Sequence, residues 1–177
     1  MTQQAARPVP SQLPSAGLAD RVRKAAGKFK VEMRDTSTDL DVQVAPEQLL
    51  DLVTILQSHD DLAFDYLRNV AGVDYEAEGM ALKYHLYSFK HGHAIQLTVP
   101  TSAGHPHVPS LTELYPAADW HEREASEMFG FVFDGHPDPK NLLLEEDLHI
   151  HPLLKAHPLQ KVEILQGIEE GPPGFTF

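Results

Sequence analysis

The chain has 177 residues, 42% hydrophobic and 23% charged, and its 14 Lys and Arg against 26 Asp and Glu give a formal net charge of −12. This composition is typical of one globular domain, and the negative charge disfavours binding to nucleic acids or anionic lipids. The absence of Cys excludes disulfides, Cys-ligated metal or iron–sulfur sites and a thiolate nucleophile within this polypeptide. With no apolar run of roughly 18 residues and no signal-peptide core, the sequence predicts an intracellular protein that does not span the membrane.

The first part of the chain predicts a tail, a helix and two strands. Residues 1–15 contain three prolines among small and polar residues, which predicts a mobile tail. Residues 16–28 have a helix-forming composition, although few large apolar side chains. Residues 29–33 and 39–44 alternate apolar and polar side chains around a polar break, which predicts two strands joined by a turn.

The middle of the chain predicts a helix, a further strand and a hairpin. Pro46 opens a helix whose apolar spacing continues to about Ser58. Residues 62–75 are interrupted by a glycine and predict a strand followed by an irregular turn. Residues 81–89 and 94–99 alternate clearly across a short polar connection, so we expect an antiparallel hairpin.

The last part predicts a loop, a second helix and an extended arm. Residues 100–110 are rich in proline and predict a loop, and Pro116 begins a helix that runs to Phe129 and stops at Gly130. Residues 135–177, the C-terminal arm, combine many large apolar side chains with six prolines in 43 residues. Because such a segment can hardly build a core alone, we expect an extended arm that packs on a partner subunit. The alternative is that part of the C-terminal arm folds back on its own domain.

Three His-x-His pairs suggest metal binding. On a strand such a pair would place both imidazoles on one face. All three pairs fall at Gly or Pro turns or in the C-terminal arm, so the structural interpretation is favoured. The pairs are His91 with His93, His105 with His107, and His149 with His151.

Charged residues are densest on the second helix. Arg123 is spaced four residues from both Asp119 and Glu127, which predicts ion pairs within the helix. An apolar stripe of Leu114, Ala118, Ala125 and Met128 encloses His121. Glu124 falls between this stripe and Trp120, so we expect it to be partly buried and to need a partner.

His121 and Glu124 also offer a metalloenzyme interpretation. Their spacing of i and i+3 fits half of a carboxylate-bridged di-metal site or an acid/base pair. The helix that begins at Pro46 supplies no histidine for the other half. The common nucleotide-binding and hydrolase motifs are also missing, so a structural ion-pair network is favoured.

A longer pattern spans the second helix and its flanks. Its members are Pro109, Ser110, Leu111, Tyr115, Pro116, Trp120, Glu122, Arg123, Glu124, Glu127, Met128, Phe129, Gly130, Phe133, Gly135, His136, Pro137, Asp138, Lys140, Leu142 and Leu143. This pattern resembles the 30 kDa subunit family of respiratory complex I, NADH:quinone oxidoreductase. The resemblance covers roughly residues 30–160.

The resemblance implies an α+β fold: a two-layer domain over residues 16–134, with a mixed, largely antiparallel sheet of four to five strands packed by helices. It implies a non-catalytic subunit in the peripheral arm of a proton-pumping enzyme, on the cytoplasmic side of the bacterial respiratory membrane. The expected partners are the 49 kDa-type quinone-site subunit and neighbouring iron–sulfur subunits. Flavin, iron–sulfur clusters and quinone are expected on other subunits, with no cofactor on this chain.

Several motif residues are expected at the interface with other subunits. They are Trp120, Glu122, Arg123, Glu124, Glu127, Gly130, Gly135, His136, Pro137, Asp138 and Lys140. Lys140 stands where the family usually has Arg, and Lys cannot reproduce a bidentate clamp on a carboxylate. Pro139, Leu148, Asp119 and His121 also depart from the family pattern. The alternatives are an equivalent subunit of a related quinone- or ferredoxin-linked dehydrogenase or membrane hydrogenase, and a stand-alone His/Glu metalloenzyme.

Overall fold

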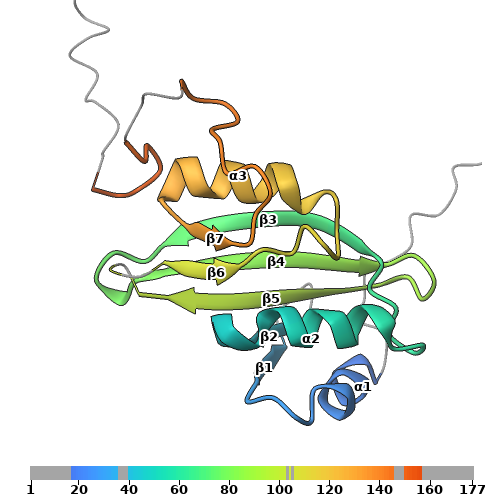
Figure 1. The fold of residues 1–177 in the computed structure, drawn as a ribbon. Helices are drawn as coiled ribbons and strands as arrows, with labels where there is room; N and C mark the ends of the chain where they lie inside the picture. The colour runs from blue at the N-terminus through green and yellow to red at the C-terminus, as the bar shows by residue number, and fades with distance from the viewer. Residues whose placement is uncertain (1–16, 36–39, 103, 105, 146–149, 157–177) are drawn as a thin grey trace, which may run out of the picture.

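A computed structural model describes residues 17–35, 40–102, 104, 106–145 and 150–156 (Figure 1). The predicted N-terminal tail and the C-terminal arm beyond residue 156 lie outside the described residues, as do His105, Leu148 and His149.

A five-stranded sheet forms one layer of the domain (Figure 1). Its strands are β1 (Glu32–Asp35), β2 (Leu40–Gln43), β3 (Tyr66–Asp74), β4 (Met80–Ser88) and β5 (His93–Thr101), in the order β1-β2-β5-β4-β3. Neighbouring strands run antiparallel except β2 and β5, which are parallel. The predicted α+β fold with a mixed, largely antiparallel sheet is therefore confirmed.

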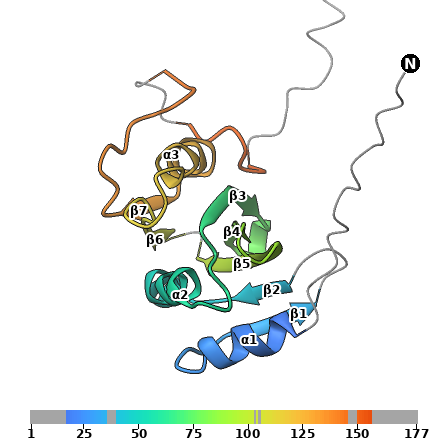
Figure 2. The ribbon, with the colours of Figure 1, turned by 90° about the vertical axis from the view of Figure 1, so that its right-hand side faces the viewer.

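The helices are α1 (Leu18–Ala25), α2 (Pro46–Ser58) and α3 (Ala118–Phe129), with a short 3-10 turn, η1 (Glu76–Glu78). Figure 2 shows α2 and α3 on the same side of the sheet, which gives the two expected layers. The bounds of α2 agree with the prediction, because Pro46 occupies the first turn, where a helix needs no N–H donor. None of the helices among the described residues is long and apolar enough to cross a membrane.

The predicted hairpin forms the centre of the core. Three cross-strand pairs of β4 and β5 present fully buried side chains. The pairs are Leu82 with Val99, Tyr84 with Leu97, and Leu86 with Ile95. Strict alternation specifies which face of a strand is buried, so the sequence pattern was sufficient here.

Two short strands were not predicted from the sequence. β6 (His107–Pro109) lies within the predicted loop and pairs in parallel with β7 (Val132–Asp134). Backbone bonds from Val132 N to Pro106 O (3.0 Å) and from Ser110 N to Asp134 O (2.9 Å) extend the contact. Strands of three residues are too short to show alternation, and their pairing joins segments on either side of α3.

β3 continues through Gly72 without the predicted interruption. The ring of Phe129, at the end of α3, occupies the place of a side chain here, since a Cβ on Gly72 would lie 2.4 Å from Phe129 Cδ2. The glycine therefore permits close packing of α3 on β3.

This packing predicts the effect of Gly72→Ala. In an open strand the substitution would be stabilising, but here we expect a loss of ~1–3 kcal/mol in the free energy of unfolding because of the steric clash. Urea unfolding measures the change. Gly104→Ala is the control, because a Cβ there meets no atom within 4 Å. The explanation is wrong if Gly72→Ala costs as much in a Phe129→Val background as in the wild type.

Candidate functional site

The first buried carboxylate of the motif, Glu122, ties α3 to the segment that precedes it. Its side chain is fully buried against the sheet. Ser110 Oγ donates to Glu122 Oε2 at 2.6 Å, and Leu111 N donates to Glu122 Oε1 at 2.7 Å. These bonds partly compensate for the loss of water around the carboxylate.

Burial determines the electrostatics around Glu122. It raises the pKa of this carboxyl, while the bonds from Ser110 and Leu111 and the neighbouring His136 oppose the rise. Burial, together with the Glu122 charge, likewise raises the pKa of the Tyr84 hydroxyl well above its ordinary value. Glu122 is thus a carboxyl group in an environment that disfavours its charge.

The second buried carboxylate, Glu127, holds the beginning of the C-terminal arm. It accepts backbone N–H groups from Leu142 at 2.8 Å, Leu143 at 3.0 Å and Leu144 at 3.3 Å. Three consecutive amides that converge on one carboxylate form an anion-binding turn. The resulting charge-assisted bonds fix the path of the chain over α3.

Arg123 binds the same stretch of chain through its carbonyl groups. Its Nε and Nη2 donate to the carbonyl oxygens of Lys140 and Asn141, each at 2.8 Å. The predicted ion pairs of Arg123 with Asp119 and Glu127 are wrong, since Arg123 is absent from the ion pairs found among the described residues. The partners of Arg123 are therefore carbonyl groups of the C-terminal arm, which is distant in sequence, and not the carboxylates one helical turn away.

His136 is held beside the first turn of α3. Its ring is nearly buried, with Nε2 at 3.2 Å from the carbonyl oxygen of Asp119 and 3.4 Å from its carboxylate. Asp138 N lies 3.1 Å from Nδ1, so both ring nitrogens have a partner in their own chain. Lys140, in place of the family's Arg, pairs with Asp138 at 3.2 Å on the surface.

Residues 150–156, the return segment, come back to the C-terminal end of α3. His151 Nδ1 lies 2.9 Å from the carbonyl oxygen of Glu127, and Leu153 N donates to the carbonyl oxygen of Met128 at 3.1 Å. The His151 ring lies over Gly130, where a Cβ would be 2.9 Å from ring Nε2. Gly130 also ends the helix with a left-handed φ of 82°. The described part of the C-terminal arm therefore contacts its own domain, as in the alternative that the sequence left open.

The expected burial of Glu124 is wrong. Glu124 is exposed, whereas Ala118, Glu122 and Ala125 form the buried stripe of α3. Ala118 and Ala125 are buried as predicted, and Glu122 lies beside them because its hydrogen-bond partners in the interior hold its side chain there. Trp120 is also exposed, at 67% of its full area.

The remaining motif residues lie at the surface after β7. Gly135 has a left-handed φ of 85°, and Pro137 and Asp138 are exposed. The predicted subunit interface remains a prediction for the whole set of motif residues, although the carboxylates of Glu122 and Glu127 face their own chain.

The described histidines of the three pairs have hydrogen-bond partners in their own chain. The rings of His91 and His93 stack at 5.4 Å, and their Nε2 atoms lie 2.7 and 2.8 Å from the carbonyl oxygens of Asp60 and Leu62. His107 Nδ1 is 3.0 Å from Asp134 Oδ1. Among the described residues, no group of three or more His, Cys, Asp and Glu side chains gathers in a way that could hold a metal ion.

Fold and site together define an α+β domain whose central helix binds the chain segments before and after it. The partners missed from sequence are mostly backbone amides and carbonyls, which leave no mark in composition or periodicity. Only the motif pattern itself pointed to this region.

Comparisons with known proteins show which family has this fold and motif. The family described as respiratory-chain NADH dehydrogenase, 30 Kd subunit, matches residues 42–163. An NADH-quinone oxidoreductase subunit of Roseiflexus castenholzii is 45% identical over 119 residues, covering 66% of this chain and 68% of that protein. The subunit of the same name from Roseiflexus sp. strain RS-1 is 39% identical over 145 residues, covering 81% and 83%. The chain belongs to the 30 kDa subunit family of respiratory complex I.

Two solved structures have the same fold. A structure described as Nqo5 of the trypsin-resistant fragment (1-134) aligns with a TM-score of 0.59 at 26% identity, covering 68% of this chain and 98% of that chain. A chain of the membrane-bound sulfane sulfur reductase, an archaeal respiratory membrane complex, aligns with a TM-score of 0.69 over 90% of this chain and 95% of that one. Its identity of 19% shows the fold alone.

The raised pKa of Glu122 predicts how stability depends on pH. The folded protein holds this proton more tightly than the unfolded chain, so the stability from this group is present at low pH and is lost as pH rises through the folded-state pKa. Glu122→Gln removes the titration and keeps an acceptor for Leu111 N. We expect the stability of wild type relative to Glu122→Gln, measured by urea unfolding, to fall as the pH rises above the ordinary glutamate pKa of about 4.3.

Glu124→Gln is the matched control, because it makes the same change on the exposed side of α3. Its pH profile corrects for the altered net charge. Parallel profiles for wild type and Glu122→Gln would contradict the assignment.

Proposed function

We propose that this chain is a non-catalytic structural subunit of the peripheral arm of a proton-pumping NADH:quinone oxidoreductase. The observation that carries the proposal is the use of the motif's charged groups. The side chains of Glu122, Arg123 and Glu127 form hydrogen bonds with backbone groups of their own chain. Groups that are engaged in this way shape a surface and are poorly placed to carry a reaction.

The proposed contact with the 49 kDa-type subunit involves apolar side chains around α3. Several large apolar side chains are exposed on α3 and on the segments that it holds, namely Trp120, Leu143, Ile150 and Leu153. Exposed apolar groups of this size, rimmed by charged residues, are typical of protein interfaces. We place neighbouring iron–sulfur subunits and the rest of the C-terminal arm at the edge of the same surface.

The proposal assigns the redox chemistry to other subunits. The sequence has no Cys to ligate an iron–sulfur cluster, so flavin, clusters and quinone are placed on its partners. In this arrangement the chain is a peripheral protein on the cytoplasmic side of the bacterial respiratory membrane, attached through the complex. Isolation of the complex through a tag on this chain, followed by assay of NADH:quinone activity, tests the assignment.

A second candidate is the equivalent subunit of a related quinone- or ferredoxin-linked dehydrogenase or membrane hydrogenase. The observation that favours it is the fold shared with a chain of an archaeal respiratory membrane complex. The partners that co-purify with the tagged chain, and the electron donor that they accept, distinguish the two.

The interface location predicts opposite results for two equally exposed aromatic residues. Trp120 on α3 is 67% exposed and Phe89, after β4, is 68% exposed. We expect Trp120→Ala to weaken assembly by ~2 kcal/mol or more, about thirtyfold, because aromatic anchors dominate such interfaces. Phe89→Ala should leave assembly unchanged. Native gel electrophoresis of complexes from complemented deletion strains measures both, and equal effects would exclude this interface.

Arg123→Ala should harm assembly more than it harms the domain. The domain loses two hydrogen bonds to carbonyls, while the turn at 140–144 loses one of its two anchors on α3. We expect a small decrease in Tm and a clear loss of assembled complex. Arg68→Ala is the control, since Arg68 stacks on Tyr87 in the sheet. Normal assembly and turnover with Arg123→Ala would contradict the role of this helix.

A further inference from the structure

β3 is the last strand of the sheet, so one of its edges has no neighbouring strand. Its ladder with β4 is regular over residues 69–74. Tyr75 N donates to the carbonyl oxygen of Gly79 at 2.9 Å, so this N–H group points toward the β4 side. Backbone groups alternate in direction along an antiparallel strand, and those of Val70 and Gly72 therefore point outward. In the described part of the chain, no other group bonds to them.

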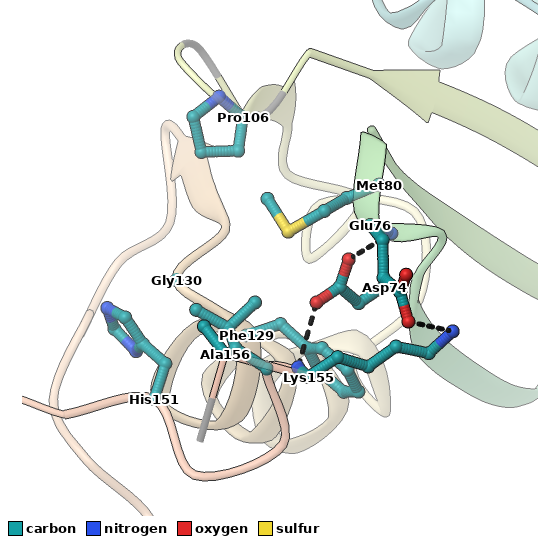
Figure 3. A pocket seen from close by; sticks show the side chains of 10 residues that line it. Asp74, Glu76, Met80, Pro106, Phe129, Gly130, His151, Lys155 and Ala156 are labelled. Atoms are coloured by element: carbon teal, nitrogen blue, oxygen red, sulfur yellow. Dashed lines mark hydrogen bonds and ion pairs between the residues drawn. The ribbon is translucent and has the colours of Figure 1, made fainter. Parts of the chain in front are cut away.

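The open part of this edge is short, because both of its ends are blocked. A bulge between Leu67 and Asn69 interrupts the strand before it, and bulges protect an edge from further pairing. At the other end the return segment is bonded to β3, since Lys155 N donates to Asp74 Oδ2 at 2.9 Å (Figure 3). Residues 69–73 carry no charge and no proline. An edge of this kind readily pairs with another strand.

A slot of about 230 Å³ lies beside this open part of β3. One wall is formed by residues 69–72, and the other by Glu124 and Met128 of α3 and by Leu153 of the return segment. The volume lies below the roughly 300–1,000 Å³ of pockets that enclose a small molecule. The slot therefore suits one or two side chains of an extended chain.

The α3 wall of the slot defines which side chains fit. Glu124 and Met128 are four residues apart, about 6 Å along the helix, and alternate residues of a strand are about 6.7 Å apart. Figure 1 shows α3 running alongside β3, so a strand added there presents one side chain to each of them. Glu124 is exposed and takes part in none of the ion pairs among the described residues. A Lys or Arg side chain suits this carboxylate, and an apolar one suits Met128.

We propose that the free edge of β3 at Val70 and Gly72 binds an extended segment of another subunit as an additional strand. The segment's backbone pairs with the outward groups of these two residues. One apolar side chain packs on Met128 and Leu153, and a Lys or Arg two positions along pairs with Glu124. A second copy of this chain does not fit, because it presents its own Val70 and Gly72, neither of which carries a cation. This pairing rests on the proposed function in one respect, since it requires a partner subunit.

Hydrogen exchange at single amides tests the pairing in the complex isolated through the tagged chain. In the free full-length chain we expect rapid exchange at Val70 and Gly72, and protection at Ala71 and Val73, whose N–H groups point toward β4. In the complex, exchange at Val70 and Gly72 should be about a hundredfold slower. Mass spectrometry with electron-transfer fragmentation resolves these neighbouring amides.

A charge reversal tests the proposed cation. We expect Glu124→Lys to speed exchange at Val70 and Gly72 in the complex about tenfold, because the like charges repel the added strand. Glu113→Lys is the matched control, since it makes the same change at an exposed site before α3, and it should leave this exchange slow. Equal exchange in the two variants would show that no cation faces Glu124.

The remaining outcomes separate the proposed strand from the proposed function. Unchanged exchange at Val70 and Gly72 in an assembled complex would overturn the strand and leave the proposed function standing. Protection of these amides in the free chain that increases with its concentration would also overturn it, because a second copy would then cover the edge. A tagged chain that co-purifies with no other subunit would overturn both.

Discussion

The buried carboxylate of Glu127 is the interaction on which the C-terminal part of this structure depends. It lies in the last turn of α3, where the helix dipole disfavours an anion and no basic side chain compensates. Its charge is instead balanced by the N–H groups of three consecutive residues, Leu142 to Leu144. Because an unpaired buried carboxylate would cost several kcal/mol, the turn at 142–144 and the end of α3 stabilise each other.

The spacing of Arg123 and Glu127 explains why one helical turn is enough to hold the chain. Residues four apart lie on the same helical face, so the guanidinium and the carboxylate reach adjacent peptides. Arg123 donates hydrogen bonds to the carbonyl oxygens of residues 140 and 141, and Glu127 accepts hydrogen bonds from the amides that follow. Glu122, five residues before Glu127, points to another side and fixes the approach to α3 through Ser110 and Leu111. One helix thus determines the path of the chain on both of its ends.

The sequence predicted what depends on local patterns. α2 and the β4–β5 hairpin were located correctly because apolar spacing and alternation are local properties. On α3 the predicted burial of Ala118 and Ala125 is confirmed, but the wrong carboxylate was placed inside, Glu124 instead of Glu122, because periodicity does not reveal hydrogen-bond partners. Those partners are 11 residues away for Leu111 and 15 for Leu142, and both are backbone groups that any residue provides. The pairing of β6 with β7 also joins separated segments, so it follows from the packed fold alone.

Charged side chains around α3 bond within the domain and apolar side chains are exposed, and this difference follows from the free-energy cost of burying charge. The motif's carboxylates and guanidinium obtain their hydrogen bonds inside the domain, where the partners are fixed before any other subunit arrives. In the proposed interface a partner would meet exposed apolar side chains such as Trp120 and Leu143, whose burial requires no exchange of hydrogen bonds. A chain with a net charge of −12 can in this way form close contacts without placing unpaired charge in the interface. Pre-organisation by Glu127 and Arg123 also means that little conformational entropy is lost when those apolar groups are covered.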